Sequence, residues 1–173
     1  MEGRGAILDT ARELSTLIRE SAISAAVIGG IAVVLHGHWR ATKDIDLLLG
    51  SEPSELAELL KAHGFLHDPL RKEFIRDDIP VHLVLPDQAK TTLRHTIEIE
   101  GILTVDLPQL IEMKLRSGTT NLLRAQDLAD VIGLIRSRRL TSEFARSIDK
   151  TLRPTFRKLV RAIAQEGMDE VRT

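Results

Sequence analysis

Apolar residues recur along this chain with the spacing of helices in several places. In residues 6–20, Ile7, Ala11, Leu14 and Ile18 repeat every three to four positions with charges between them. That period predicts an amphipathic helix. Further helices are predicted at 31–35, at 51–64, after Asp106, at 124–138, at 142–151 and from Pro154 onward. Ser51 is the expected cap of the second of these, and Asp106 with Gln109 three residues later forms a capping-box pattern.

Four other segments have the character of strands. The first two, 25–28 and 44–49, are short apolar runs. Residues 73–85 are predicted to form a hairpin that turns at Asp77-Asp78, and residues 96–105 a strand or strand pair broken at Gly101. Strands with interspersed helices come first and only helices follow, an order that indicates the α+β class. We expect an α/β core over 1–105 and a helical part over 106–173, together one structural unit.

The composition narrows the class of protein. Hydrophobic residues make up 43% of the chain, enough for a core, and cysteine is absent, which excludes thiolate metal ligands and a cysteine nucleophile. No apolar run approaches the ~20 residues of a membrane-spanning helix, and the charged N-terminus has no signal-peptide pattern. We expect a soluble, cytoplasmic protein with no membrane association.

The net charge of −1 conceals an uneven distribution. Residues 1–113 contain 11 Lys and Arg against 18 Asp and Glu, whereas residues 114–161 contain 12 against 4. A basic segment attracts polyanions, so residues 114–161 are a candidate surface for an RNA or protein acceptor. Arginine-rich, solvated helix faces are the equally available explanation.

Two carboxylates, Asp44 and Asp46, stand in an otherwise apolar strand. Alternate side chains share one face of a strand and lie about 6.6 Å apart at ~3.3 Å per residue. Two ionised carboxylates so placed repel unless a cation lies between them, and an oxygen-preferring divalent metal is one such cation. Arg40 and Lys43, which are close in sequence, could neutralise the aspartates instead. Both explanations are open at this point.

Gly29-Gly30 follows the first strand and precedes a short helix. Such a turn exposes backbone N–H groups, which suit phosphate, and an Asp pair follows it by fifteen residues. Metal beside phosphate is what phosphoryl and nucleotidyl transfer require. The chain has neither G-x-x-x-x-G-K-[ST] nor G-x-G-x-x-G, so P-loop and Rossmann chemistry are not indicated.

These residues resemble a known superfamily. The stretch GGIAVVLHGHWRATKDIDLLL (29–49) is similar to the nucleotidyltransferase-fold proteins, a group that includes DNA polymerase beta, and most of all to the AbiEii/AbiGii toxin-type branch and related bacterial nucleotidyltransferases. The matching positions are Gly29, Gly30, His36, Gly37, Arg40, Thr42, Asp44 and Asp46. A weaker match continues in 106–118 and 124–135, at Lys114, Arg124, Asp127 and Asp130.

The resemblance implies a small mixed β-sheet flanked by helices and a C-terminal helical segment. It implies that Asp44 and Asp46, with a third carboxylate on a neighbouring strand, hold Mg²⁺ (or Mn²⁺). A nucleoside monophosphate would pass from an NTP to a hydroxyl of RNA, protein or a small molecule, in the setting of a toxin–antitoxin or phage-defence system. The expected nucleotide-binding residues are Gly29, Gly30, Arg40, Thr42, Lys43, Lys114 and Asp127.

The chain departs from this family pattern at the third acidic position. The strand IPVHLVL places His82 there, on the face opposite Val81 and Leu83. Imidazole can accept a proton but is a poor ligand for Mg²⁺. Three consequences are open: a changed metal or base, a different carboxylate from Glu73, Asp77 or Asp78, or a site that binds nucleotide without turnover.

Two other classes of function therefore compete with an enzyme whose catalytic residues are Asp44, Asp46 and His82. One is a nucleotide- or RNA-binding module on the same fold, impaired by His82. The other is an interaction protein whose acids are salt-bridged. Nucleotide binding and turnover, measured separately, distinguish the three.

Overall fold

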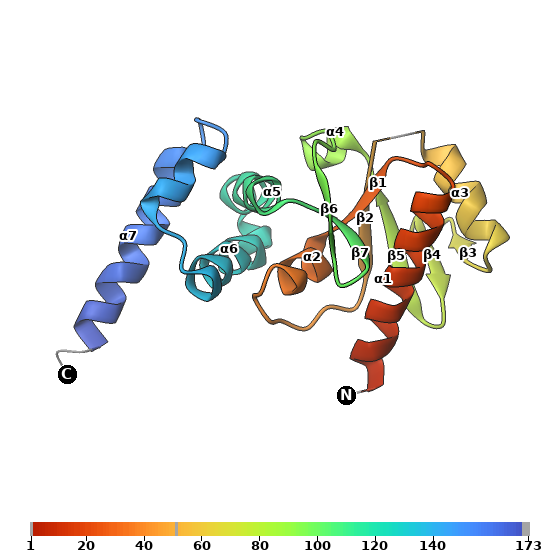
Figure 1. The fold of residues 1–173 in the computed structure, drawn as a ribbon, viewed down its shortest axis with the longest axis horizontal. Coiled ribbons are helices and arrows are strands. Elements are labelled where there is room, and N and C mark those ends of the chain that lie inside the picture. Colours follow the sequence, from red (N-terminus) through yellow and green to blue (C-terminus); the bar gives the residue numbers. More distant parts are fainter. Residues whose placement is uncertain (1, 51, 171–173) are drawn as a thin grey trace. The chain divides into compact units, whose positions relative to one another are not determined.

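The computed structural model describes residues 2–50 and 52–170 (Figure 1). The chain divides into two compact units. The first comprises residues 1–35 and 40–106, and the second comprises residues 36–39 and 107–173.

The first unit is built on a mixed sheet. Within the described residues this sheet has seven strands in the order β3-β4-β5-β2-β1-β7-β6. The strands are β1 (Ala25–Ile28), β2 (Ile45–Leu49), β3 (Leu66–Asp68), β4 (Glu73–Arg76), β5 (Ile79–Val84), β6 (Thr96–Ile99) and β7 (Ile102–Val105). The pairs β2·β5 and β1·β7 are parallel, and the others are antiparallel. With its flanking helices this sheet confirms the predicted α+β class.

Two tight hairpins follow the predicted turns. Asp77 and Asp78 join β4 to β5 and have φ values of 52° and 59°, and Glu100 and Gly101 join β6 to β7 with 53° and 80°. Positive φ at both central residues is the geometry of a two-residue hairpin loop, which Asp and Gly tolerate well. Strand β3, at an edge of the sheet, had not been predicted from the sequence.

The helices of the first unit begin close to the predicted positions. They are α1 (Glu2–Glu20), α2 (Gly29–Leu35), α3 (Pro53–Ala62) and α4 (Pro86–Ala89). The predicted cap Ser51 lies outside the described residues, and α4 had not been predicted. Helix α2 begins at the glycines themselves, two residues earlier than expected.

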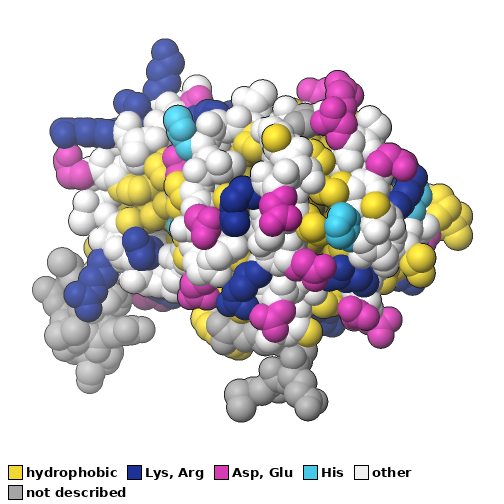
Figure 2. All heavy atoms as spheres, turned by 45° about the vertical axis from the view of Figure 1, so that its right-hand side comes forward, with side chains coloured by type: hydrophobic (Ala, Val, Ile, Leu, Met, Phe, Trp, Pro, Cys, Tyr) yellow, Lys and Arg dark blue, Asp and Glu magenta, His cyan; other side chains and the backbone are white. Residues whose placement is uncertain are grey.

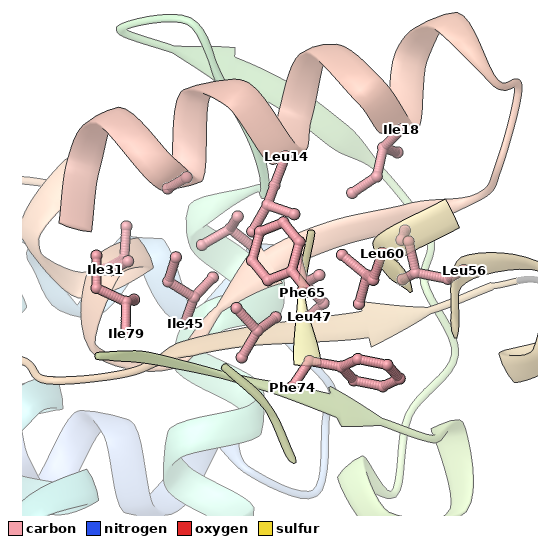
Figure 3. Packing of buried hydrophobic residues seen from close by; sticks show 14 of the residues in the cluster. Leu14, Ile18, Ile31, Ile45, Leu47, Leu56, Leu60, Phe65, Phe74 and Ile79 are labelled. Atoms are coloured by element: carbon pink, nitrogen blue, oxygen red, sulfur yellow. The ribbon is translucent and has the colours of Figure 1, made fainter. Parts of the chain in front are cut away.

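The core of the first unit lies between α1, α3 and one face of the sheet (Figure 3). The predicted apolar stripe of α1 is buried: Leu14 is fully enclosed and Ile18 is 2% exposed. From the sheet, Ile45 and Leu47 of β2 point into the same cluster. Because side chains alternate along a strand, Asp46 and Leu48 lie on the opposite face of β2.

The outer surface of the first unit carries paired charges rather than a single sign. Ion pairs join Arg19 of α1 to Glu98 of β6, at 3.0 Å, and Glu13 of α1 to Arg76 of β4. Figure 2 shows acidic and basic side chains interspersed over the face it draws. Exposed pairs of this kind contribute little stability individually.

The second unit is helical in its described residues. Its elements are α5 (Leu107–Thr120), η1 (Leu122–Arg124), α6 (Ala125–Arg138), η2 (Ser142–Ser147) and α7 (Arg153–Glu170). The predicted helix at 142–151 is wrong in type and length, because only a short 3₁₀ helix forms there. Glu112 accepts a hydrogen bond from the Asp149 backbone N–H at 2.8 Å, and Asp149 accepts one from Thr151 N–H at 2.8 Å. Side chains thus satisfy N–H groups that a continuing helix would use.

Candidate metal and nucleotide site

Asp44 and Asp46 lie at the start of β2, a central strand of the sheet of the first unit. Asp46 is the second residue of β2, which pairs with β1 on one side and with β5 on the other. Asp44, predicted as the first residue of this strand, stands one residue before the observed β2. Both side chains are partly exposed, Asp44 at 43% and Asp46 at 26%, so they can reach a ligand and solvent.

His82 reaches these aspartates from the neighbouring strand. The register of β2 and β5 places His82 directly beside Asp46, as expected for the third position. The His82 Nδ1 atom lies 3.1 Å from Asp46 Oδ1 and 3.8 Å from Asp44 Oδ2. One donor atom from each of the three residues lies within 4.8 Å of the other two. Two carboxylates and an imidazole at this spacing fit the ligand set of a divalent cation.

Glu73 makes a second contact to His82, on the far side of the ring. Its Oε2 atom lies 3.0 Å from His82 Nε2, and its side chain is only 8% exposed. Of the three carboxylates considered as substitutes for the missing acid, Glu73 alone touches His82 among the described contacts. Asp77 and Asp78 occupy the exposed hairpin turn, five and four residues before His82.

Three neighbouring acids change the proton affinity of His82. Partial burial on its own lowers the pKa of an imidazole. Hydrogen bonds to Glu73 and Asp46, with the charges of Asp46 and Asp44, outweigh that effect and raise the pKa of His82 above its ordinary value of 6.5. In the metal-free protein His82 is therefore a cation between two carboxylates over a wider pH range than a free histidine.

This raised pKa predicts a pH-dependent stability of the metal-free protein. A folded-state pKa above the unfolded value stabilises the fold fully below about pH 6.5, and that stabilisation is lost as the pH rises through the folded-state pKa. Urea unfolding in the presence of a metal chelator should show wild type losing stability relative to His82→Gln as the pH rises from about 6.5 through the folded-state pKa of His82. The exposed His95→Gln variant should follow wild type. A pH-independent difference between wild type and His82→Gln would contradict the prediction.

The two glycines at the start of α2 lie against the same cluster. Gly29 has a φ of +65°, and a Cβ atom there would stand 2.1 Å from Asp46 Oδ2. A Cβ at Gly30 would stand 2.5 Å from Thr42 Oγ1 and 2.8 Å from Arg40 Nη2. Close approach of the site's own side chains therefore requires glycine here. Whether the turn also receives phosphate stays a prediction.

The loop before β2 supplies the other predicted nucleotide ligands. Thr42 Oγ1 lies 3.4 Å from Asp44 Oδ1, within reach of a weak hydrogen bond. Arg40 donates from Nη1 to the carbonyl oxygen of Ala41 at 3.0 Å. Lys43 is exposed. The structure thus brings Arg40 and Thr42 beside the glycines, and the phosphate contacts of this loop stay predictions.

Lys114 and Asp127 belong to the second unit, where they form a buried ionic cluster. The Lys114 ammonium lies 2.6 Å from Asp127 and 2.9 Å from Asp130, and Arg124 Nε lies 2.8 Å from Asp127. Burial would raise the pKa of Asp127, but the hydrogen bonds from Lys114 and Ser117 and the charge of Lys114 lower it below its ordinary value. The sequence pattern gave no sign that Lys114 would be buried between two acids. The nucleotide-binding role of Lys114 and Asp127 stays a prediction.

The fold has counterparts among solved structures. An antigenic nucleotidyltransferase-like protein from Paracoccidioides brasiliensis has a TM-score of 0.56 at 16% identity, covering 93% of this chain and 88% of its own. The antibiotic-resistance factor ANT(2'')-Ia has a TM-score of 0.56 at 15% identity, covering 98% of this chain and 99% of its own. No protein-family model and no curated protein matches the sequence. At these identities the likeness shows a nucleotidyltransferase fold, as the sequence resemblance implied, and the AbiEii-type branch stays a prediction.

The structure also bears on association with membranes. Among the described residues, no helix combines the length and the apolar character needed to cross a lipid bilayer.

Proposed function

We propose that this protein is a metal-dependent nucleotidyltransferase that moves a nucleoside monophosphate from an NTP to a hydroxyl group. One observation carries the proposal: Asp44, Asp46 and His82 converge within 4.8 Å beside the Gly29-Gly30 turn, on a nucleotidyltransferase fold. A pair of carboxylates next to a glycine turn is suited to a divalent ion that carries a polyphosphate.

The reaction would form a bond between the acceptor oxygen and the α-phosphorus and break the bond from that phosphorus to the pyrophosphate oxygen. A bound Mg²⁺ or Mn²⁺ would neutralise negative charge on the reacting oxygens. Asp44 and Asp46 would hold the ion, with His82 completing the ligand set. The acceptor proton would leave to solvent through Asp44, which is the more exposed of the two carboxylates. Gly29 keeps Asp46 in place because any side chain there would displace it.

The acceptor is proposed only by class. One neighbour, ANT(2'')-Ia, is solved with adenylyl-2''-tobramycin, a small molecule that carries a nucleotide. The basic residues of 114–161 favour RNA or a protein as alternatives. The sequence resemblance to AbiEii-type proteins suggests a toxin–antitoxin role. Growth arrest on expression of wild type but not of Asp46→Asn would support that role, and unaffected growth would contradict it.

The reaction is tested by incubating the full chain with each α-³²P-labelled NTP, Mg²⁺ or Mn²⁺, and a panel of acceptors. We expect label transfer and stoichiometric pyrophosphate, both abolished by EDTA. Absence of transfer to bulk RNA, protein and aminoglycoside acceptors, together with absence of pyrophosphate release, would count against the proposal.

A second function is favoured by the cation at the third position. When protonated, His82 offsets the charge of Asp46 where the family pattern has an acid, and we expect a site with less negative charge to bind a metal–nucleotide complex without promoting turnover. Calorimetry with NTP and metal tests binding. If His82 disables the enzyme, His82→Asp should gain metal-dependent pyrophosphate release while wild type shows binding alone. A His82→Asp variant that binds but stays inactive would remove His82 as the cause.

A further inference from the structure

The contacts of His82 point to a residue that the family resemblance does not assign. Glu73, His82 and Asp46 stand in one row across the adjacent strands β4, β5 and β2. The register pairs Phe74 with Val81, so its continuation places Glu73 opposite His82, and Asp46 is paired with His82 on the other side. Neighbouring strands are about 4.8 Å apart, which is the spacing that lets an imidazole bridge both acids.

The row fixes the direction of the His82 ring. Its Nε2 atom lies 3.0 Å from the Glu73 carboxylate. When Nδ1 binds a metal ion, Nε2 carries the ring hydrogen and donates it to Glu73. The other nitrogen, Nδ1, faces Asp46 at 3.1 Å and Asp44 at 3.8 Å. In the Nε2–H tautomer of the neutral ring, the lone pair on Nδ1 points at the two aspartates, where a metal ion would bind.

The Glu73 side chain is itself restrained by burial and by a basic neighbour. Its side chain is 8% exposed, and its second oxygen lies 3.6 Å from the Arg71 guanidinium. A buried carboxylate that receives the N–H of a metal-ligating histidine fixes the ring orientation and strengthens the ligand. Removal of such partners in other metal sites typically weakens metal binding by about 10- to 100-fold.

We infer that Glu73 is a positioning residue that holds His82 Nδ1 toward Asp44 and Asp46, and that the resulting site selects a first-row transition ion such as Mn²⁺ over Mg²⁺. The inference rests on the metal site of the proposed function. Mg²⁺ prefers oxygen ligands and strict octahedral geometry, whereas imidazole nitrogen suits transition metals. A ligand set of two carboxylates and one nitrogen moves the preference of this site away from Mg²⁺.

The test measures metal binding without turnover. The full chain is titrated with Mn²⁺, free Mn²⁺ is followed by electron paramagnetic resonance, and Mg²⁺ is added as competitor. Glu73→Ala should lose about 10- to 100-fold in Mn²⁺ affinity with little change for Mg²⁺. Glu73→Gln should lose less, because its amide oxygen still accepts from Nε2–H. His82→Asp should gain Mg²⁺ affinity and lose the preference for Mn²⁺. The matched control Asp78→Asn removes a charge from the same hairpin, in the exposed turn, and should bind as wild type.

A second measurement does not depend on any variant. Two-bond ¹⁵N–¹H correlation spectra of metal-free wild type, above the pKa of His82, should show the ring protonated on Nε2. Protonation on Nδ1 would overturn the inference, as would wild-type Mn²⁺ affinity in a folded Glu73→Ala protein or an unchanged ion preference in His82→Asp.

These results are separable from the fate of the proposed function. Nucleotidyl transfer by wild type with Glu73-independent Mn²⁺ binding would overturn the inference and leave the function standing. Glu73-dependent Mn²⁺ selectivity with no transfer would support the inference and contradict the enzyme. A wild-type protein that binds neither ion overturns both.

Discussion

Replacing Asp46 with asparagine should reduce nucleotidyl transfer by about 10²- to 10³-fold, or about 3–4 kcal/mol, the cost of losing one preorganised electrostatic contact in other active sites. Asparagine keeps the size of the side chain, which packs against Gly29, and removes the charge that faces His82 Nδ1 at 3.1 Å. The loss should therefore appear in pyrophosphate release and in Mn²⁺ affinity while the chain stays folded.

Two comparisons make the Asp46→Asn result specific. Thermal unfolding of the metal-free variant should stay within a few degrees of wild type, since Asp46 is partly exposed and no core residue changes. Asp78→Asn, which removes a charge at the exposed turn, should retain full activity. Transfer by Asp46→Asn at more than a tenth of the wild-type rate would rule out this carboxylate as a metal ligand.

Replacing Lys114 with methionine should destabilise the second unit by about 3–5 kcal/mol, the usual cost of breaking a buried ion pair from one side. The ammonium is 9% exposed and lies between Asp127 and Asp130, whose side chains are 6% and 0% exposed. Methionine fills similar volume, so the loss arises because the Lys114 charge no longer compensates the two buried carboxylates, of which Asp127 keeps its contact to Arg124. Urea unfolding followed by circular dichroism measures it.

Two controls accompany Lys114→Met: removal of an exposed lysine, and removal of the two acids that Lys114 contacts. Lys158→Met removes an exposed lysine from α7 and should change stability by less than about 0.5 kcal/mol. Adding Asp127→Asn and Asp130→Asn to Lys114→Met should recover part of the loss, because no uncompensated charge then stays buried. A Lys114→Met protein as stable as wild type would show that the acids are solvated or protonated in the fold.

Local signals in the sequence were sufficient for most of the fold. The period of Ile7, Leu14 and Ile18 predicted α1 because those side chains bury one stripe, and the Asp77-Asp78 pair predicted a turn because both residues tolerate positive φ. Strand β3 carried no such signal. It has three residues, it lies at the sheet edge and Leu66 is 76% exposed, so pairing with β4 rather than its own pattern makes it a strand.

The candidate site was predictable only in part, for a similar reason. Asp44 and Asp46 are two residues apart in sequence, and the alternation of a strand is enough to place them together. His82 could be placed because β5 alternates as well. Glu73 could not be chosen over Asp77 or Asp78, because the choice depends on hairpin register, and a shift of one residue turns every side chain to the other face. The position of the His82 imidazole between Glu73 and Asp46 depends on the pairing of three strands, β4, β5 and β2.

The strand order also gives the residues of this site different expected resistance to local unfolding. Asp46 lies on β2, which is paired along both sides, whereas Glu73 lies on β4, whose outer neighbour is the three-residue edge strand β3. Fraying proceeds inward from such an edge, so backbone amides of β3 and β4 should exchange hydrogen sooner than those of β2. A brief opening of the β3–β4 hairpin would break the contact between Glu73 and the His82 imidazole and leave both aspartates in place beside β1 and β5. The carboxylates that carry the charge of the site thus lie on or next to the central strand β2. The residue proposed to set its preference between ions lies on β4, near the sheet edge, where we expect more frequent local opening.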